Sequence, residues 1–175
     1  DFGTTGNVRR SDLVMYDRQT ESWWQQFTGE AIVGELSGKS LRLLPVRVEP
    51  FGSFKARMAG GKVLAPNDPK MRPYGMNPYE GYDTRELPFL FRGELPEGIA
   101  PLAYVVLVGE EAWPLDLVRE RREIVAGDLR LRWSPGQNSV LDAQDIIEGR
   151  DLGAVIVERR TGGVWADVVH DVTFA

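Results

Sequence analysis

The feature that most constrains the fold is the stretch Ser11–Gly34, which reads SDLVMYDRQTESWWQQFTGEAIVG. Leu13–Tyr16 is an apolar run of strand length, and the polar run Asp17–Thr20 interrupts it before the paired indoles Trp23 and Trp24. Successive side chains of a strand point to opposite faces, so one indole can anchor the core while the other covers a cleft. The segment therefore predicts two strands joined through a polar corner.

The rest of the chain alternates short apolar runs with turns rich in Gly and Pro, which is typical of all-β domains. Strands are expected over residues 41–48, 89–91, 102–108 (central in its sheet), 129–133, 154–157 and 164–174, with a hairpin turn at Gly162-Gly163. Helical spacing occurs over residues 51–58, 115–122 and 140–147. We predict a mainly β architecture, either a barrel or a two-layer sandwich, with two or three short helices.

Length and composition limit the class of protein. A chain of 175 residues suits one β-rich domain spanning residues 1–175. The net charge of −5 argues against a nonspecific nucleic-acid binder, and no apolar run reaches the roughly 20 residues that span a bilayer. The absence of cysteine excludes thiol chemistry and thiolate metal sites within the chain, and one histidine excludes a multi-histidine metal site. No phosphate-loop or dinucleotide motif occurs, so nucleotide binding has no motif support and the sequence leaves any cofactor undetermined.

Four segments carry a family resemblance: FGTTGN, the Ser11–Leu36 stretch, RPYGMNPYEGYD and GEEAWPLDL. Together they resemble an exported bacterial and archaeal family known as domain of unknown function 3179. The resemblance covers nearly the whole chain. It implies a β-rich domain, usually preceded by a signal peptide or lipoprotein signal, without an established activity.

The resemblance also implies an internal duplication. Family members have an upstream segment that ends in a C-P-L-C motif, and a second copy begins near Leu102. In this copy the two cysteine positions correspond to Ser134 and Gln137. We therefore expect the chain to be a fragment of a longer protein. We also expect this fragment to pack against the missing upstream segment.

Candidate catalytic residues are few. Asp17 and Arg18 occupy the polar corner and offer a carboxylate beside a guanidinium for acid–base work, although such residues more often satisfy turn backbone groups. His170 is the one imidazole and lies on the apolar side of its expected strand, which favours a buried structural histidine with a backbone partner over a catalytic base. A Ser-His-Asp triad through Ser134 or Ser139 lacks the G-x-S-x-G motif.

Candidate ligand-binding residues form two groups. Trp23, Trp24 and Gln25 combine aromatic faces with an amide, as sugar- and ring-binding sites do. The loop Arg72–Asp83 is unusually long and irregular, and loops carry function more often than strands. Its candidates are Tyr74, Asn77, Tyr79, Tyr82 and Asp83. The loop is equally consistent with a ligand lid, a small oxygen-ligand cation site formed with Glu80, or a Pro/Tyr-braced cover of the sheet.

These observations favour an exported or cell-envelope β domain that binds a small-molecule or glycan ligand, or serves as a structural module. The alternative is an enzyme whose thiol or metal site depends on the missing C-P-L-C segment, with this chain forming the pocket walls. An enzyme predicts polar groups from several strands in one concavity, whereas a binding module predicts exposed aromatic rings around Trp24 or Tyr79.

Overall fold

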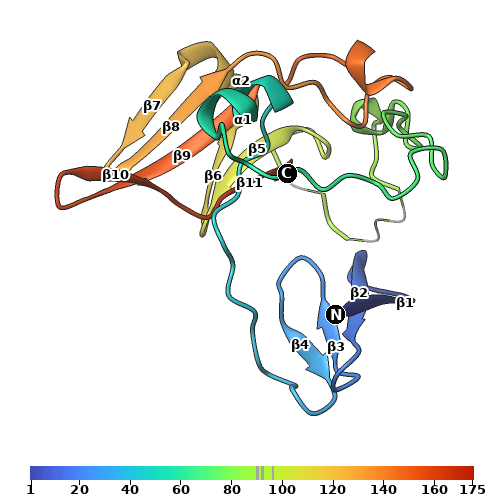
Figure 1. Ribbon diagram of the computed structural model, residues 1–175. Coiled ribbons are helices and arrows are strands. Elements are labelled where there is room, and N and C mark those ends of the chain that lie inside the picture. The colour runs from blue at the N-terminus through green and yellow to red at the C-terminus, as the bar shows by residue number, and fades with distance from the viewer. Residues whose placement is uncertain (90, 92, 96) are drawn as a thin grey trace. The chain divides into compact units, whose positions relative to one another are not determined.

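The computed structural model describes residues 1–175 except residues 90, 92 and 96. The chain divides into two compact units, Asp1–Leu44 with Phe89–Leu95, and Pro45–Pro88 with Pro96–Ala175. The described residues are mainly β, with three antiparallel sheets and two α-helices, and none of these sheets closes into a barrel (Figure 1). The predicted fold class is therefore confirmed. The expectation of one domain stays a prediction.

The first unit contains a four-stranded antiparallel sheet with its strands in chain order. The strands are β1 Phe2–Arg9, β2 Asp12–Asp17, β3 Trp23–Gln25 and β4 Ala31–Val33. Arg10 and Ser11 form the turn between β1 and β2, and both take positive φ, 52° and 65°. This backbone geometry matches a two-residue turn to the natural twist of the strands.

Strand β3 sends its two indoles to opposite faces of the sheet. Trp24 is 5% exposed, and its ring packs edge-on against Phe2 at a centroid distance of 6.1 Å. Val14 and Ala31 are buried with it, whereas Trp23 is 37% exposed. The prediction of an extended segment with one indole packed inward is confirmed.

The second unit contains two antiparallel sheets, in the orders β10-β9-β8-β7 and β11-β5-β6. Their strands are β5 Tyr104–Val108, β6 Glu111–Pro114, β7 Glu123–Ala126, β8 Leu129–Ser134, β9 Ala154–Thr161, β10 Val164–Asp167 and β11 Asp171–Phe174. The predicted central strand and the predicted hairpin turn between β9 and β10 are confirmed.

One hydrophobic core joins the two sheets of this unit with helix α2 Leu115–Arg121 (Figure 1). Val106 of β5, Val118 of α2, and Leu131 and Val157 of β8 and β9 are all fully buried. Burial of a Val or Leu side chain contributes about 1.5–3 kcal/mol, so this core fixes the strands that carry the site. The remaining helical elements are α1 Phe51–Arg57 and the single 3-10 turns η1 Tyr82–Thr84 and η2 Ile146–Glu148.

Two sequence predictions fail in the described residues, and a third falls partly outside them. Residues 41–48 form no strand, and their apolar side chains Leu43, Val46 and Val48 are exposed. Alternation alone supplies no pairing partner, and Pro45 cannot donate to a ladder. The helix expected over residues 140–147 is reduced to η2. The strand expected over 89–91 includes Leu90, which lies outside the described residues.

The last predicted strand, residues 164–174, is two strands in different sheets. Strand β10 pairs with β9, and β11 pairs with β5. Between them, the N–H of Val168 still donates to the carbonyl oxygen of Val157 at 3.1 Å before the chain changes sheets. A strand that switches sheets through a bend preserves its alternation, which is why the sequence reads as continuous.

Candidate functional site

In the first unit, Asp17 accepts hydrogen bonds on both carboxylate oxygens. Oδ1 accepts from the backbone N–H groups of Gln19 and Thr20, and Oδ2 accepts from the Thr20 hydroxyl and from Trp24 Nε1 at 2.9 Å. These bonds, that from Trp24 above all, lower the pKa of Asp17 to about 2. The carboxylate is therefore ionised at neutral pH and positions the corner.

The other candidates of this unit are also engaged locally. The amide of Gln25 donates to Arg9 O and Asp12 Oδ2 and accepts from Arg9, each at 2.9 Å. The guanidinium of Arg18 lies over the ring of Tyr16, 5.5 Å from its centroid. Of the two indoles, Trp23 is the one that offers exposed aromatic surface.

In the second unit, the predicted ligand loop is held along its length by a second loop. Asn77 donates through its backbone to Gln144 at 2.7 Å and through its side chain to Ala143 at 3.1 Å. The N–H groups of Gly81 and Tyr82 donate to Asp142 and Leu141. Asn77 is buried, and its side-chain oxygen accepts from the N–H of Tyr79.

The tyrosines of this loop differ in exposure. Tyr74 and Tyr79 are exposed, whereas Tyr82 packs against Phe174 at a centroid distance of 6.1 Å. Tyr79 stacks edge-on against Tyr82 at 6.4 Å. At the end of the loop, the ring of Tyr82 in η1 thus contacts both Tyr79 and Phe174, directly before Asp83.

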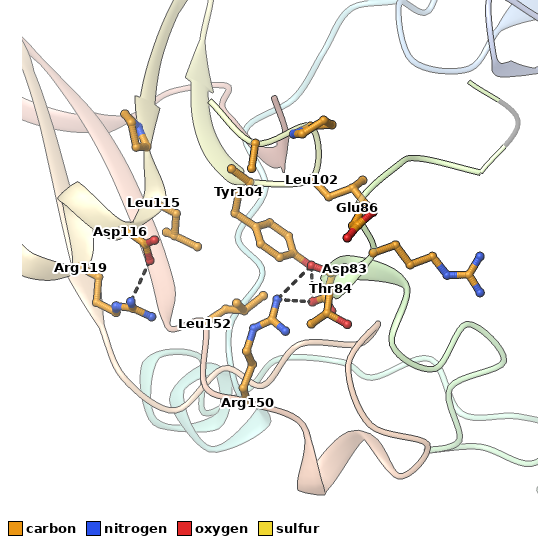
Figure 2. Close-up of a pocket in the computed structure, with 15 residues that line it drawn as sticks. Asp83, Thr84, Glu86, Leu102, Tyr104, Leu115, Asp116, Arg119, Arg150 and Leu152 are labelled. Carbon is orange, nitrogen blue, oxygen red and sulfur yellow. Dashed lines mark hydrogen bonds and ion pairs between the residues drawn. The ribbon is translucent and has the colours of Figure 1, made fainter. Parts of the chain in front are cut away.

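Asp83 joins four segments that are distant in sequence. Its Oδ2 accepts from the Ser139 hydroxyl at 2.6 Å, from the Tyr104 hydroxyl at 3.1 Å and from Arg150 Nη2 at 2.9 Å. The Asp83 side chain is 0% exposed, and that of Arg150 is 38% exposed. A second carboxylate, Asp142, accepts from Arg150 Nη1 at 3.3 Å. Figure 2 shows Tyr104 and Arg150 directed at Asp83.

The other Asp83 oxygen has no partner. Among the described residues, Oδ1 of Asp83 is the one buried side-chain oxygen or nitrogen that makes no hydrogen bond. Burying a polar atom without a partner costs about 1–3 kcal/mol, so such an atom in a folded protein calls for an explanation. Its neighbour Tyr104 stays neutral, because burial above all raises the pKa of that phenol to about 12.

A cavity of about 510 Å³ opens beside this network (Figure 2). We call it the Asp83 cavity, and its chief lining residues are Asp83, Tyr104, Leu115, Arg119, Arg150 and Leu152. Arg119 of α2 forms an ion pair with Asp116 at 2.8 Å, and both side chains are largely exposed. Exposed pairs of this kind are worth little, so Arg119 is available to an incoming anion.

A smaller cavity of about 280 Å³ shares Tyr104 and Leu152 with the first. We call it the His170 cavity, because it contains the one imidazole of the chain. Ser139 also lines it, but the hydroxyl of Ser139 donates to Asp83, and Nδ1 of His170 lies 3.0 Å from Val168 O. Ser139 and His170, which were considered for a triad, thus line one cavity, but each forms a hydrogen bond with another group.

The structure groups the predicted residues in two separate places. Asp17, Trp24 and their neighbours belong to the first unit, whereas Asp83 and His170 line cavities of the second. Tyr104 and Arg150 were not predicted. A signal for Tyr104 is present, since it is the one hydroxyl in the apolar run LAYVVLV. The described residues hold no cluster of three His, Asp or Glu side chains able to bind a metal ion.

Comparisons with known proteins identify one family. The model of a family described as "Protein of unknown function (DUF3179)" matches residues 1–173. No curated protein and no solved structure shows significant similarity to the chain. Within the described part of the chain, no helix has the length and apolarity needed to cross a membrane.

Proposed function

The chain belongs to the DUF3179 family of proteins of unknown function, and we propose that it is a binding module for a small zwitterionic molecule. The Asp83 cavity is the proposed site. Asp83 receives the ligand's positively charged donor group, and Arg119 receives its anionic group. Both side chains line this cavity, Asp83 from η1 and Arg119 from α2.

The observation that carries this proposal is the unpartnered oxygen of Asp83. Oδ2 already accepts from three donors, whereas the buried Oδ1 accepts from none. A ligand ammonium would give Oδ1 a charge-assisted hydrogen bond, which is roughly twice as strong as a neutral one. Because Oδ1 is buried, binding requires a neighbouring side chain to shift, and we propose that this is the partly exposed Arg150, which also pairs with Asp142.

The same contacts favour binding over catalysis. Ser139, a candidate nucleophile, is buried, donates to Asp83 and accepts from the N–H of Leu141 at 3.1 Å. Tyr104 has its pKa raised to about 12, so it is a poor base at neutral pH. Both hydroxyl groups therefore serve to fix the position of Asp83.

The test uses three small probes of matched size: β-alanine, propionate and propylamine. Binding to the ¹⁵N-labelled chain is followed by the backbone amide signals of Thr84, Ala103 and Leu115, which line the cavity. We expect β-alanine to bind most tightly, because it alone carries both charged groups. Equal binding of β-alanine and propionate would exclude a role for Asp83, since propionate has no ammonium group.

A matched pair of variants localises the effect. Arg119→Ala removes the proposed anion contact and should weaken β-alanine binding about three- to tenfold, down to the level of propylamine. Arg159→Ala removes an arginine from a similarly exposed ion pair, with Asp128 at 3.2 Å. Arg159 does not line the cavity, so this control should bind like the parent chain.

An exported, cell-envelope location is part of the proposal and is supported by the family resemblance. Fractionation of cells that express the full-length protein tests it, and recovery in the cytoplasm would contradict it. The thiol-dependent enzyme remains the alternative hypothesis. It predicts that metal analysis and thiol titration of the full-length protein find a reactive C-P-L-C segment, and Ser134 would then line its approach.

A further inference from the structure

The His170 cavity differs in chemistry from the Asp83 cavity. Its walls are mainly aliphatic and include Val48, Leu152, Val155 and Val172. Ligand sites in proteins commonly combine such apolar walls with a few placed polar groups. The one imidazole of the chain, that of His170, also lines this cavity and is 9% exposed.

One hydrogen bond identifies the ring nitrogen of His170 that carries a proton. Nδ1 of His170 lies 3.0 Å from the carbonyl oxygen of Val168. A carbonyl can only accept, so Nδ1 carries the proton in this contact. In the neutral ring Nε2 then holds the lone pair and is a hydrogen-bond acceptor.

The other polar side chains of the lining direct their donors away from the cavity. Tyr104 and Ser139 donate their hydroxyl protons to Asp83. Gln137 donates to Asn138 O, and the amide of Asn138 donates to the carbonyls of Ile146 and Ile147. The lining also includes the carboxylate of Asp171, which can only accept when ionised. The cavity thus offers acceptors among mainly apolar walls, and a matching ligand must supply the donor.

We propose that the His170 cavity binds a small molecule with an alkyl or aryl body and one hydroxyl donor, which bonds to Nε2 of His170. Size supports this class of ligand. An apolar cavity of about 150 Å³ holds benzene, so a cavity of about 280 Å³ accepts a substituted single ring. This site is distinct from the proposed zwitterion site and does not depend on it.

Nuclear magnetic resonance gives a direct test because the chain has one histidine. The ring signals of His170 therefore need no assignment by mutation, and their ¹⁵N shifts report the tautomer. The probes are 4-ethylphenol and its methyl ether, 4-ethylanisole, which differ in the hydroxyl donor. We expect 4-ethylphenol to shift the His170 signals and to bind about three- to tenfold more tightly than the ether, as one hydrogen bond allows.

Two valine variants test the location. Val172→Phe places a larger side chain in the cavity lining, whereas Val164→Phe makes the same change on β10 outside that lining. Both valines are exposed to a degree that tolerates substitution. Val172→Phe should weaken 4-ethylphenol binding at least fivefold, and Val164→Phe should leave it unchanged.

A histidine variant tests the chemistry. The amide nitrogen of asparagine can replace Nδ1 as donor to Val168, so His170→Asn keeps that bond and removes Nε2. In this variant, titrations followed by the amide signals of Val155 and Val172 should show equal affinity for the phenol and the ether. Three outcomes would each overturn the proposal: unshifted His170 signals, equal affinity of the two probes for the parent chain, or equal effects of the two valine variants. Arg119→Ala should not alter phenol binding, which separates this site from the Asp83 cavity.

Discussion

The substitution Asp83→Ala should destabilise the second unit by about 2 kcal/mol, because it leaves three donors without their common acceptor. The Ser139 hydroxyl is buried, the Tyr104 hydroxyl is half-buried, and Arg150 is partly exposed. All three donate to the same oxygen, Oδ2 of Asp83. No other residue described here takes over that role.

The magnitude follows from the exposure of each donor. A buried hydroxyl that loses its partner costs about 1–3 kcal/mol, which applies to Ser139. The Tyr104 hydroxyl can turn toward a cavity. The loss of its hydrogen bond to Asp83 therefore costs about the net value of one bond, about 0.5–1.5 kcal/mol. Arg150 keeps Asp142 and is rehydrated, which adds about 1 kcal/mol. These losses sum to about 3–5 kcal/mol, and removal of the unpaired Oδ1 offsets about 1–3 kcal/mol of them, which leaves a net cost of about 2 kcal/mol.

Urea unfolding followed by residue-resolved amide signals measures this cost. The signals of Val106 and Leu131 report the core of the second unit, whereas a bulk signal mixes both units. Asp128→Ala is the matched control, because it removes a carboxylate from an exposed pair with Arg159 and should cost less than about 1 kcal/mol.

A second variant tests the cause of the loss. Adding Ser139→Ala and Tyr104→Phe to Asp83→Ala removes two of the stranded donors, so part of the lost stability should return. If Asp83→Ala lowers the free energy of unfolding no more than Asp128→Ala does, the hydrogen bonds to Asp83 do not stabilise the second unit and the reasoning fails. If the triple variant is less stable by the sum of its parts, packing and not unpaired donors explains the loss.

Two further predictions concern the core and the polar corner. Gly153 has φ +75°, and a Cβ there would lie 2.1 Å from the Trp133 ring. Gly153→Ala should therefore destabilise the second unit by more than about 2 kcal/mol in urea, whereas Gly163→Ala, with φ +85° but open space, should cost about 1 kcal/mol. In the first unit, Trp24→Phe removes the main bond that lowers the pKa of Asp17 to about 2. Because this folded-state pKa is depressed, Asp17 stabilises the fold above its unfolded pKa near 4, and that contribution is lost as the pH falls toward 2. The variant should raise the Asp17 pKa and shrink this acid-dependent contribution in a carboxyl ¹³C titration, and an unchanged pKa would contradict the assignment.

Sequence reasoning predicted correctly those strands whose alternation of apolar and polar side chains stays within one sheet. In β8, Leu129, Leu131 and Trp133 point into the core, and Arg130 and Arg132 point away from it. Alternation reports which side chains avoid water, and that is sufficient where a strand stays in one sheet. It does not report the partner, which explains both the missing strand over residues 41–48 and the undivided strand expected over residues 164–174.

The site was less predictable because long-range contacts assemble it. The composition of its loop marked Asp83 as a ligand residue, but Ser139 and Arg150 lie 56 and 67 positions away along the chain. Neither residue belongs to a motif, and an arginine near Gly149 resembles many surface arginines. Only the packing of η1 against the loops that precede β9 makes one carboxylate the common acceptor.

Asp17 and Asp83 are both buried, but their hydrogen-bond donors are distributed differently over the two carboxylate oxygens. Asp17 distributes four hydrogen bonds over both oxygens, and the result is a low pKa and a fixed corner. Asp83 concentrates its three side-chain donors on Oδ2 and leaves Oδ1 without a partner beside a cavity. If stability were the sole constraint, a donor placed at Oδ1 would remove the penalty of the unpaired atom. The unpaired Oδ1 is the basis of our proposal that a group from outside the chain binds there, and the ammonium of a small zwitterion has the charge and the donors to do so.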